Sequence, residues 1–383
     1  MKKLAVITSH PIQYNAPLFR LLSVRKHLLL KVFYTWGQTE SGHVYDPDFK
    51  REFSWDIPLL DGYESEFIHN YSKQPGAGHY KGIINKNLEE RVLLYQPDAV
   101  LIIGWSFQSH LKALLYFKGK LPVLFCGDST LLDEMPGFNL KKMIRRMFLS
   151  WVYRHIDWAL YTGEANKLYF LKHGVREDQL VFGPHAIDDK HFADTDGRYE
   201  LEAKKRKREL GIPADAFVFL FAGKMEPKKN PLLLCKAFKK LNNQKSWLIL
   251  VGNGHLEQEL KYFMQGDDRV CFLDFQNQSQ MPVIYRMADV FVLPSAGPGE
   301  TWGLAVNEAM ACGKVCIISS KCGCAEDLGI IGQNRIFQSG NLDQLVEAMK
   351  EAMSAPDKNM IPEEYYKYSI QKLASSIESV VCS

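Results

Sequence analysis

Two glutamates in the second half of the chain have neighbours that suit a ligand site. Glu300 and Glu308 lie eight positions apart in the segment LPSAGPGETWGLAVNEAMACGKVCIIS at 293–319. This segment is typical of a strand end, a loop rich in Gly and Pro, a helix over about 303–312, a stop at Gly313 and a buried strand. Carboxylates are good acceptors for paired sugar hydroxyls. Because ligands of open α/β sheets bind at the carboxyl ends of strands, we expect both carboxylates to face one site.

The loop that precedes this helix also suits an anionic group. Glycines at 297, 299 and 303 allow the backbone to approach a ligand closely. Free N–H groups at the start of the helix favour a diphosphate. Without these neighbours, Glu300 would be an ordinary helix-entry charge and Glu308 a solvent-facing helix residue.

Short apolar runs separated by helical segments must position this loop. They lie at 4–8, 29–34, 99–103, 122–126 and 158–161, and again at 217–222, 247–251, 270–273, 290–293 and 315–319. Such runs are typical of buried parallel strands, which predicts an α/β fold.

The length of the chain predicts two domains. Its 383 residues exceed what one hydrophobic core normally fills, and two domains imply a cleft between them. We expect Rossmann-like domains over 1–195 and 196–362, a polar linker near 193–200, and a C-terminal helix over 363–383 that crosses back to the first domain.

Composition narrows the function classes. A net charge of +3 is too small to indicate nucleic-acid binding, so no nucleic-acid partner is expected. The apolar run before His10 is too short for a signal peptide, and no run approaches the roughly 18 apolar residues of a membrane span. Eight cysteines without an export signal favour a reducing compartment, so the predicted location is cytoplasmic.

Two patterns resemble metal ligands. Cysteines cluster at 312, 316, 322 and 324, but the first closes a helix and the second opens an apolar strand, which favours buried thiols over zinc. Asp-x-Asp sequences at 46–48 and 194–196 lie in polar stretches and are interpreted as turns. We therefore expect neither a metal nor a cofactor.

Two basic segments differ in their apolar content. The run KKRKR at 204–208 has no interleaved aromatic residues and is interpreted as a solvated helix face. The segment KKMIRRMFLSWV at 141–152 alternates basic pairs with apolar residues and predicts an amphipathic helix. This helix suits either an anionic membrane surface or packing within the protein beneath a basic rim.

The segment at 293–319 resembles the Glu-x7-Glu motif of family 4 glycosyltransferases, in which a loop of the form PSxxExxGLxxxEAMAxG binds the donor. Members of this family are retaining enzymes of the GT-B fold, with two Rossmann-like domains facing across a cleft. The resemblance implies that Glu300 contacts the transferred sugar as a catalytic residue and that Glu308 contacts the nucleotide ribose. It also implies donor contacts by the residues that follow Glu300, which are Thr301, Trp302, Gly303 and Leu304.

Three further segments are similar to donor-binding parts of that family. AGKMEPKKN at 222–230 resembles its Gly-Arg-x4-Lys segment, which implies that Lys224 and Lys229 neutralise the donor pyrophosphate beside Gly223. Lys224 stands where Arg is usual, so the charge remains but the bidentate fork is lost. VGNGHLEQEL at 251–260 resembles the family's VGxGxxxxxL turn and brings in Gly252, and the segment at 270–295 resembles the base-binding segment. The residues implied beside the nucleobase include Phe275 and Gln276.

The first half of the chain resembles the family less closely. SHPIQYNAPLFR at 9–20 is similar to the opening of some bacterial members, which implies that His10 and Gln13 lie at the cleft beside the donor or acceptor. PHAIDDKHF at 184–192 resembles the family segment before the interdomain linker. Many members carry a His at the end of a first-domain strand, whereas PVLFCGDST at 122–130 offers Asp128, whose role is not inherited.

The function implied by the resemblance is transfer of a sugar from a nucleotide diphosphate-sugar to a glycan or lipid-linked acceptor, in bacterial surface polysaccharide synthesis. It places the chain at the inner face of the cytoplasmic membrane. The alternatives are a nucleotide-sugar epimerase or hydrolase on the same fold, and an inactive nucleotide-sugar-binding protein. An NAD oxidoreductase is disfavoured because no Gly-x-Gly-x-x-Gly follows the first strand.

Overall fold

The computed structural model describes residues 1–37, 44–46, 51–53, 55–135, 137, 139–354 and 360–383. The chain divides into two compact units. Unit 1 holds residues 1–44, 57–186 and 369–383, and unit 2 holds residues 45–56 and 187–368. The main crossing between the units therefore follows Ala186, and the C-terminal helix belongs to unit 1.

Unit 1 is built on a parallel sheet with the order β5-β2-β1-β6-β7-β8-β9. Its strands are β1 (Lys2–Thr8), β2 (Leu28–Tyr34), β5 (Glu64–Phe67), β6 (Ala99–Ile103), β7 (Val123–Cys126), β8 (Trp158–Tyr161) and β9 (Leu180–Phe182). Its helices are α1 (Asn15–Ser23), η1 (Tyr80–Gly82), α2 (Leu88–Leu94), α3 (Gln108–Phe117), α4 (Leu140–Tyr153), α5 (Glu164–Lys172), η2 (Glu177–Gln179) and α14 (Ile370–Cys382). A small pair, β3 (Val44–Asp46) and β4 (Arg51–Phe53), forms a separate ribbon.

Unit 2 has a second parallel sheet with the order β12-β11-β10-β13-β14-β15. Its strands are β10 (Phe217–Ala222), β11 (Ser246–Val251), β12 (Val270–Leu273), β13 (Val290–Leu293), β14 (Val315–Ser319) and β15 (Arg335–Phe337). Its helices are α6 (Asp189–Phe192), α7 (Arg198–Glu209), α8 (Pro231–Leu241), α9 (Glu257–Phe263), α10 (Met281–Arg286), α11 (Leu304–Ala311), α12 (Ala325–Leu328), α13 (Leu342–Ser354) and η3 (Glu363–Tyr368).

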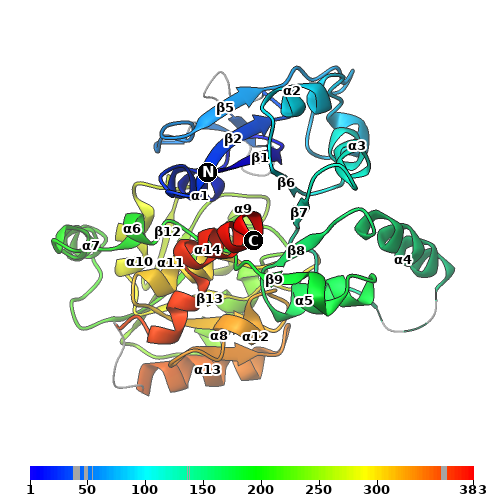
Figure 1. Cartoon of the computed structure of the whole chain (residues 1–383). Helices are drawn as coiled ribbons and strands as arrows, with labels where there is room; N and C mark the ends of the chain where they lie inside the picture. Colours follow the sequence, from blue (N-terminus) through cyan, green and yellow to red (C-terminus); the bar gives the residue numbers. More distant parts are fainter. Residues whose placement is uncertain (38–43, 47–50, 54, 136, 138, 355–359) are drawn as a thin grey trace. The chain divides into compact units, whose positions relative to one another are not determined.

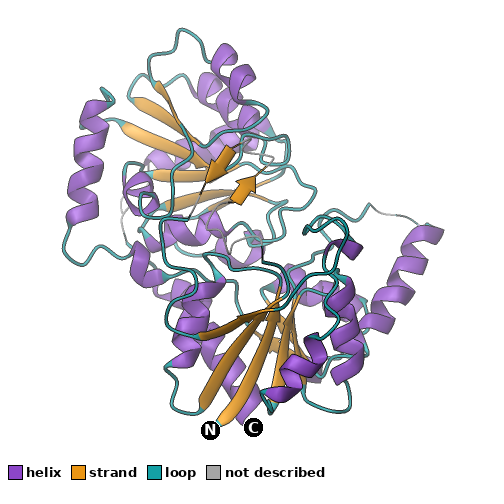
Figure 2. Cartoon of the chain, turned by 90° about the horizontal axis from the view of Figure 1, so that it is seen from above, coloured by secondary structure: helices purple, strands orange, loops and turns teal. Residues whose placement is uncertain are grey.

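Helices cover both faces of each sheet, as Figure 2 shows. The strands are accordingly apolar on both faces: the consecutive residues from Val218 to Phe221 on β10 are all fully buried. In unit 1, alternate residues of β1 belong to different clusters, Ala5 and Ile7 to one and Leu4 and Val6 to the other. Each sheet is therefore the middle layer of its own core.

Helix α14 completes one face of the unit 1 sheet. Its buried residues recur at helical spacing from Ile370 through Ala374 and Ile377 to Val381, in the same cluster as the side chains of β1 and β2. Arg25, just after α1, pairs with Glu378 at 3.1 Å. The chain end is thus part of the first core (Figure 1).

A buried histidine connects two strands of unit 1. His110 on α3 is fully buried, and its Nδ1 lies 3.1 Å and 3.0 Å from the carbonyl oxygens of Ile103 and Gly104. Because both carbonyls only accept, Nδ1 carries the hydrogen, and Nε2 lies 2.9 Å from Thr35 Oγ1. Burial lowers the pKa of His110 to about 4, so the imidazole is neutral at pH 7.

Unit 1 should therefore lose stability in mild acid. The unfolded chain takes up a proton on His110 below pH 6.5, but the folded chain does so only near pH 4. The contribution of His110 is thus present above pH 6.5 and lost as the pH falls toward 4, by about 3 kcal/mol. Urea denaturation of wild type and of His110→Gln over this range should show a flatter pH dependence in the variant. An unchanged slope would contradict the assignment.

Candidate active site

The topology of unit 2 selects one end of its sheet for a ligand. Counted from β10 as strand 1, the order is 3-2-1-4-5-6, which reverses between β10 and β13. The loops that leave the carboxyl ends of these two strands are 223–230 and 294–303. These loops carry Lys224, Lys229 and Glu300, three of the predicted site residues. Ligands of open α/β sheets bind at such a reversal.

The loop after β10 is held against the loop after β11. Gly223 N donates to Val251 O at 3.0 Å, and Met225 N donates to Asn253 O at 2.9 Å. A Cβ on Gly252 would lie 2.2 Å from Gly223 O, so only glycine fits there, at a φ of +120°. The predicted donor-site glycines Gly223 and Gly252 therefore allow two backbone segments to touch.

An ion pair joins the loops at the reversal point. Lys229 Nζ lies 2.6 Å from Glu300 Oε2, and the two side chains are only 18% and 7% exposed. Ser295 Oγ donates to the same carboxylate oxygen at 2.9 Å. The loops are also joined through their backbones, since Ala296 N donates to Lys228 O at 2.8 Å. Two predicted catalytic residues are thus in direct contact, and the half-buried Lys224 lies at the start of the same loop.

A third segment, 322–324, supports the loop that carries Glu300. Gly323 N donates to Glu300 O at 3.0 Å, and Cys324 N donates to Trp302 O at 3.1 Å. A Cβ on Gly323 would lie 1.7 Å from Thr301 O, so the approach requires glycine. Gly303 has a φ of +106° and lies beside Glu300. The main chain of 300–303 is therefore held in place by its contacts with segment 322–324.

Glu308 and Trp302 have buried partners that the sequence did not indicate. Tyr285 OH on α10 donates to Glu308 Oε2 at 2.7 Å, and both residues are buried. Trp302 Nε1 donates to Asn307 Oδ1 at 2.8 Å, and Tyr365 OH on η3 donates to Asn307 O at 3.1 Å. Leu304 begins α11 and is half-buried. Elements far apart in sequence thus fix the helix that carries Glu308.

The predicted nucleobase segment has its own support. Phe275 N donates to Asn253 Oδ1 at 2.8 Å, which fixes the chain after β12. Gln276 Oε1 accepts from Arg206 Nη2 at 3.0 Å, and its Nε2 donates to Asp274 O at 3.0 Å. Arg206 belongs to the basic run at 204–208, so one member of the run is not simply a solvated charge.

The predicted first-domain residues lie at the corresponding end of the unit 1 sheet. His10 follows β1, its Nδ1 lies 3.0 Å from Ser9 Oγ, and burial lowers its pKa. Gln13 is half-buried in the same loop. Asp128 follows β7, and its Oδ2 lies 3.8 Å from His185 Nε2 after β9. His185, which the sequence analysis did not select, is thus a neighbour of Asp128, the acidic candidate of unit 1.

The cysteines of the 312–324 cluster are buried thiols. Burial raises the pKa of all four: Cys312, Cys316, Cys322 and Cys324. Across the described part of the chain, no group of three or more His, Cys, Asp or Glu has the arrangement to hold a metal ion. Of the second Asp-x-Asp pair, Asp196 Oδ1 accepts from Arg198 N two residues on at 3.3 Å, as in a turn, whereas Asp194 accepts from Tyr199 N and Glu200 N in the first turn of α7. Asp48 lies outside the described residues.

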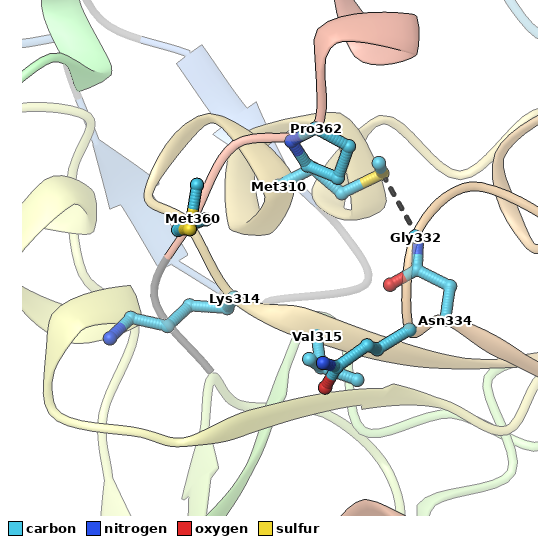
Figure 3. Close-up of a pocket in the computed structure, with 8 residues that line it drawn as sticks. Met310, Lys314, Val315, Gly332, Asn334, Met360 and Pro362 are labelled. Atoms are coloured by element: carbon cyan, nitrogen blue, oxygen red, sulfur yellow. Dashed lines mark hydrogen bonds between the residues drawn. The ribbon is translucent and has the colours of Figure 1, made fainter. Parts of the chain in front are cut away.

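A cavity of about 190 Å³ lies away from these residues (Figure 3). It is lined by Lys314 and Val315 at the start of β14, by Met310 at the end of α11, and by residues after α12 and before η3. Since it lies at the amino end of β14, it is separate from the site at the carboxyl ends.

No described helix is long and apolar enough to cross a membrane.

Comparison with known proteins shows which family this part of the chain resembles. The family model of glycosyl transferases group 1 matches residues 202–369, the segment that contains both loops, both glutamates and the supporting segment 322–324. Residues 202–369 are thus similar to the glycosyl transferases group 1. The matched segment contains every strand of the unit 2 sheet.

Curated relatives match part of the chain. A UDP-Gal:alpha-D-GlcNAc-diphosphoundecaprenol alpha-1,3-galactosyltransferase of Escherichia coli is 36% identical over 145 residues, which cover 36% of this chain and 35% of the relative. A lipopolysaccharide 1,2-N-acetylglucosaminetransferase of Salmonella typhimurium is 29% identical over 191 residues, covering 45% and 50%. The matches thus span about a third to a half of these relatives.

Solved structures match over the whole chain. HepE of Anabaena in complex with UDP has a TM-score of 0.71 at 16% identity, with 100% of both chains covered. WaaG, a glycosyltransferase involved in lipopolysaccharide biosynthesis, has a TM-score of 0.64 at 14% identity, covering 99% and 98%. The predicted α/β fold of the GT-B class is confirmed, and the segment that matches the group 1 model forms its second Rossmann-like half.

The contact between Tyr285 and Glu308 should be measurable as stability. Tyr285→Phe keeps the ring but removes the hydroxyl that donates to a buried carboxylate, so the free energy of unfolding should fall by about 1–3 kcal/mol. Urea denaturation followed by circular dichroism measures this. The control is Tyr262→Phe on α9, where the side chain is 81% exposed and a change below about 0.5 kcal/mol is expected. Equal effects of the two changes would contradict the role of Tyr285.

Proposed function

We propose that the chain is a retaining glycosyltransferase that moves a sugar from a nucleotide diphosphate-sugar to a glycan or lipid-linked acceptor. The observation that carries the proposal is the ion pair of the half-buried Lys229 with the buried Glu300, which lies at the strand-order reversal in the segment similar to group 1. The names of the relatives describe sugar transfer to a diphosphoundecaprenol-linked sugar and to lipopolysaccharide, which supports transfer over epimerisation or hydrolysis. HepE has been solved with UDP-glucose, which supports a nucleotide-sugar donor.

Lys224 and Lys229 act on the donor diphosphate. Both lysines lie in the loop that follows the carboxyl end of β10, and Lys229 pairs with the carboxylate of Glu300. As the bond to the sugar breaks, negative charge grows on the leaving diphosphate, and fixed cations in a partly buried site stabilise that charge. The start of α11, after the loop that carries Glu300, adds backbone N–H groups to the same site.

Glu300 and Glu308 divide the rest of the donor between them. Glu300 accepts hydrogen bonds from the hydroxyls of the transferred sugar, and Glu308, held by Tyr285, accepts from the ribose. Phe275 and Gln276 lie beside the base. A carboxylate that already has Ser295 as a donor and Lys229 as a counterion is in place before the donor arrives.

Retention of configuration is the finer part of the proposal and follows from the resemblance to family 4 enzymes. In that mechanism the acceptor hydroxyl attacks from the face that the leaving group departs from, and a phosphate oxygen takes its proton. No side chain is then needed as a general base. His10, Gln13 and Asp128 are proposed as contacts to the sugar or the acceptor from unit 1.

The proposed setting is the synthesis of a bacterial surface polysaccharide, in the cytoplasm at the inner face of the membrane. All eight cysteines of the chain are free, as a reducing compartment requires. The relatives supply the acceptor class, since one uses a diphosphoundecaprenol-linked sugar. We propose no nucleic-acid partner.

Nucleotide sugars should stabilise the protein. A thermal-shift screen of nucleoside diphosphates and nucleotide sugars should raise the melting temperature for at least one base, by about 2–4 °C per 1 kcal/mol of linkage energy. Nucleosides without phosphate serve as the control and should produce a smaller shift, because they lack the charge that Lys224 and Lys229 bind. If no nucleoside diphosphate or nucleotide sugar stabilises the chain, the proposal is wrong.

Glu300→Gln should separate sugar transfer from nucleotide binding. The amide keeps the volume and can still accept from Ser295, but it removes the charge, so the transfer rate should fall by about 100-fold or more. Lys229 then lacks its counterion, so thermal stabilisation by a nucleoside diphosphate should be at least as large as in wild type. Radiolabel transfer and thermal shift measure the two quantities.

The matched control is Glu351→Gln. Glu351 also forms an ion pair in unit 2, with Arg335 at 2.9 Å, but it lies on α13 away from the site. Its transfer rate should stay within about twofold of wild type. If Glu300→Gln transfers sugar at the wild-type rate, Glu300 is not catalytic. Unit 2 would then bind the nucleotide sugar without supplying this residue to the reaction.

The reaction should need no divalent metal. The charge that neutralises the diphosphate comes from Lys224 and Lys229, so transfer in excess EDTA should stay within about twofold of the untreated rate. A loss that added Mg²⁺ or Mn²⁺ restores would overturn this part of the proposal.

A further inference from the structure

Helix α4 exposes a continuous apolar stripe. At 100° per residue its exposed apolar side chains fall on one side of the helix, spanning about 140° of its circumference. Their exposed fractions lie between 40% and 66%, and they are Leu140, Met143, Ile144, Met147, Phe148 and Trp151. Figures 1 and 2 show α4 standing out from the other elements of unit 1. Exposed apolar patches of this kind mark interaction surfaces.

The opposite side of α4 packs against the core of unit 1. Leu149, Val152 and Tyr153 are buried and belong to the core cluster of unit 1. Phe148 contacts Trp105 edge to face, with ring centroids 5.6 Å apart, so the base of the stripe is fixed to the unit. Apart from Phe148, the apolar stripe therefore has no part in the core of unit 1, and the packing alternative left open by the sequence describes mainly the other face.

Basic side chains border the stripe on both sides. Lys141 and Arg145 fall along one edge and Arg146 lies toward the other, at the same 100° spacing. Lys142 lies on the opposite side of the helix, where its Nζ donates to the carbonyl oxygens of Met135 and Gly137. Residues 139–156 contain five Lys and Arg and no Asp or Glu. The first turn of α4 has no acidic residue either, although acids are favoured there by the helix dipole. The charge pattern thus matches an anionic surface.

We infer that α4 docks unit 1 on an anionic phospholipid surface, with the apolar stripe in the acyl boundary and the basic borders at the phosphates. Aromatic and aliphatic residues on one face with Lys and Arg beside them are what an interfacial helix requires. Long basic side chains can cover the apolar boundary while their charges stay with the headgroups. A protein partner would satisfy the stripe but gives no reason for the lack of acids along 139–156.

Vesicle binding tests this inference without donor or acceptor, so its outcome is separate from that of the proposed transferase activity. The full chain is mixed with phosphatidylcholine vesicles, or with vesicles that contain about one quarter phosphatidylglycerol, and centrifuged. Wild type should bind the anionic vesicles about tenfold more tightly, and raising the salt should weaken that binding.

Two variants test the two parts of the surface. Ile144→Ser with Met147→Ser removes apolar area from the stripe, and Lys141→Glu with Arg145→Glu reverses one basic border. Each should weaken binding to the anionic vesicles by about tenfold or more. All four residues are exposed, so the melting temperature should not change.

Helix α7 supplies the matched control. It also carries an exposed apolar side chain, Leu201, and a basic run, but Lys204 and Lys205 there pair with glutamates of the same helix. Leu201→Ser with Lys204→Glu should bind vesicles within about twofold of wild type. Failure of wild type to bind anionic vesicles, or unchanged binding by both α4 variants, would overturn the inference. So would a dimer in light scattering that Ile144→Ser with Met147→Ser converts to a monomer.

Discussion

The ion pair between the half-buried Lys229 and the buried Glu300 is the constraint on which the site depends. Charges with so little exposure are costly to separate, because removing either partner leaves the other uncompensated. The pair forms only if the loops after β10 and β13 meet, and that requires these strands to be neighbours. The strand order and the glycines that let the loops touch are therefore parts of one arrangement.

The same pair shapes the chemistry of the proposed transfer. In the free chain the cation that a diphosphate needs is already matched by a carboxylate, so the charges of the site are fixed without a ligand. A bound diphosphate would share Lys229 with Glu300, and the carboxylate could then turn part of its hydrogen-bonding capacity toward sugar hydroxyls. Ser295 continues to orient it from the protein side. Both roles thus follow from one contact.

Much of the fold could be predicted from local pattern, and much of the site's support could not. The apolar run at 217–222 is β10, and the helix expected over 303–312 is α11 at Leu304–Ala311. Such features depend on neighbours in sequence. Tyr285 and Ser295 could not be selected, because a Tyr in an apolar helix and a Ser in a loop have no distinguishing pattern. Their contacts exist only once α10, α11 and the loop pack together.

Helix α4 is a second case in which the sequence pattern alone could not decide the structure. Its amphipathic pattern was evident, but the pattern has two apolar sides, and only tertiary structure decides which one the core takes. Leu149, Val152 and Tyr153 face the core, which leaves the more continuous stripe outside. An exposed apolar stripe lowers solubility, and apart from the contact of Phe148 with Trp105 it adds little to the stability of unit 1. Such a surface is expected only where another phase or partner covers it, and its basic borders favour an anionic one.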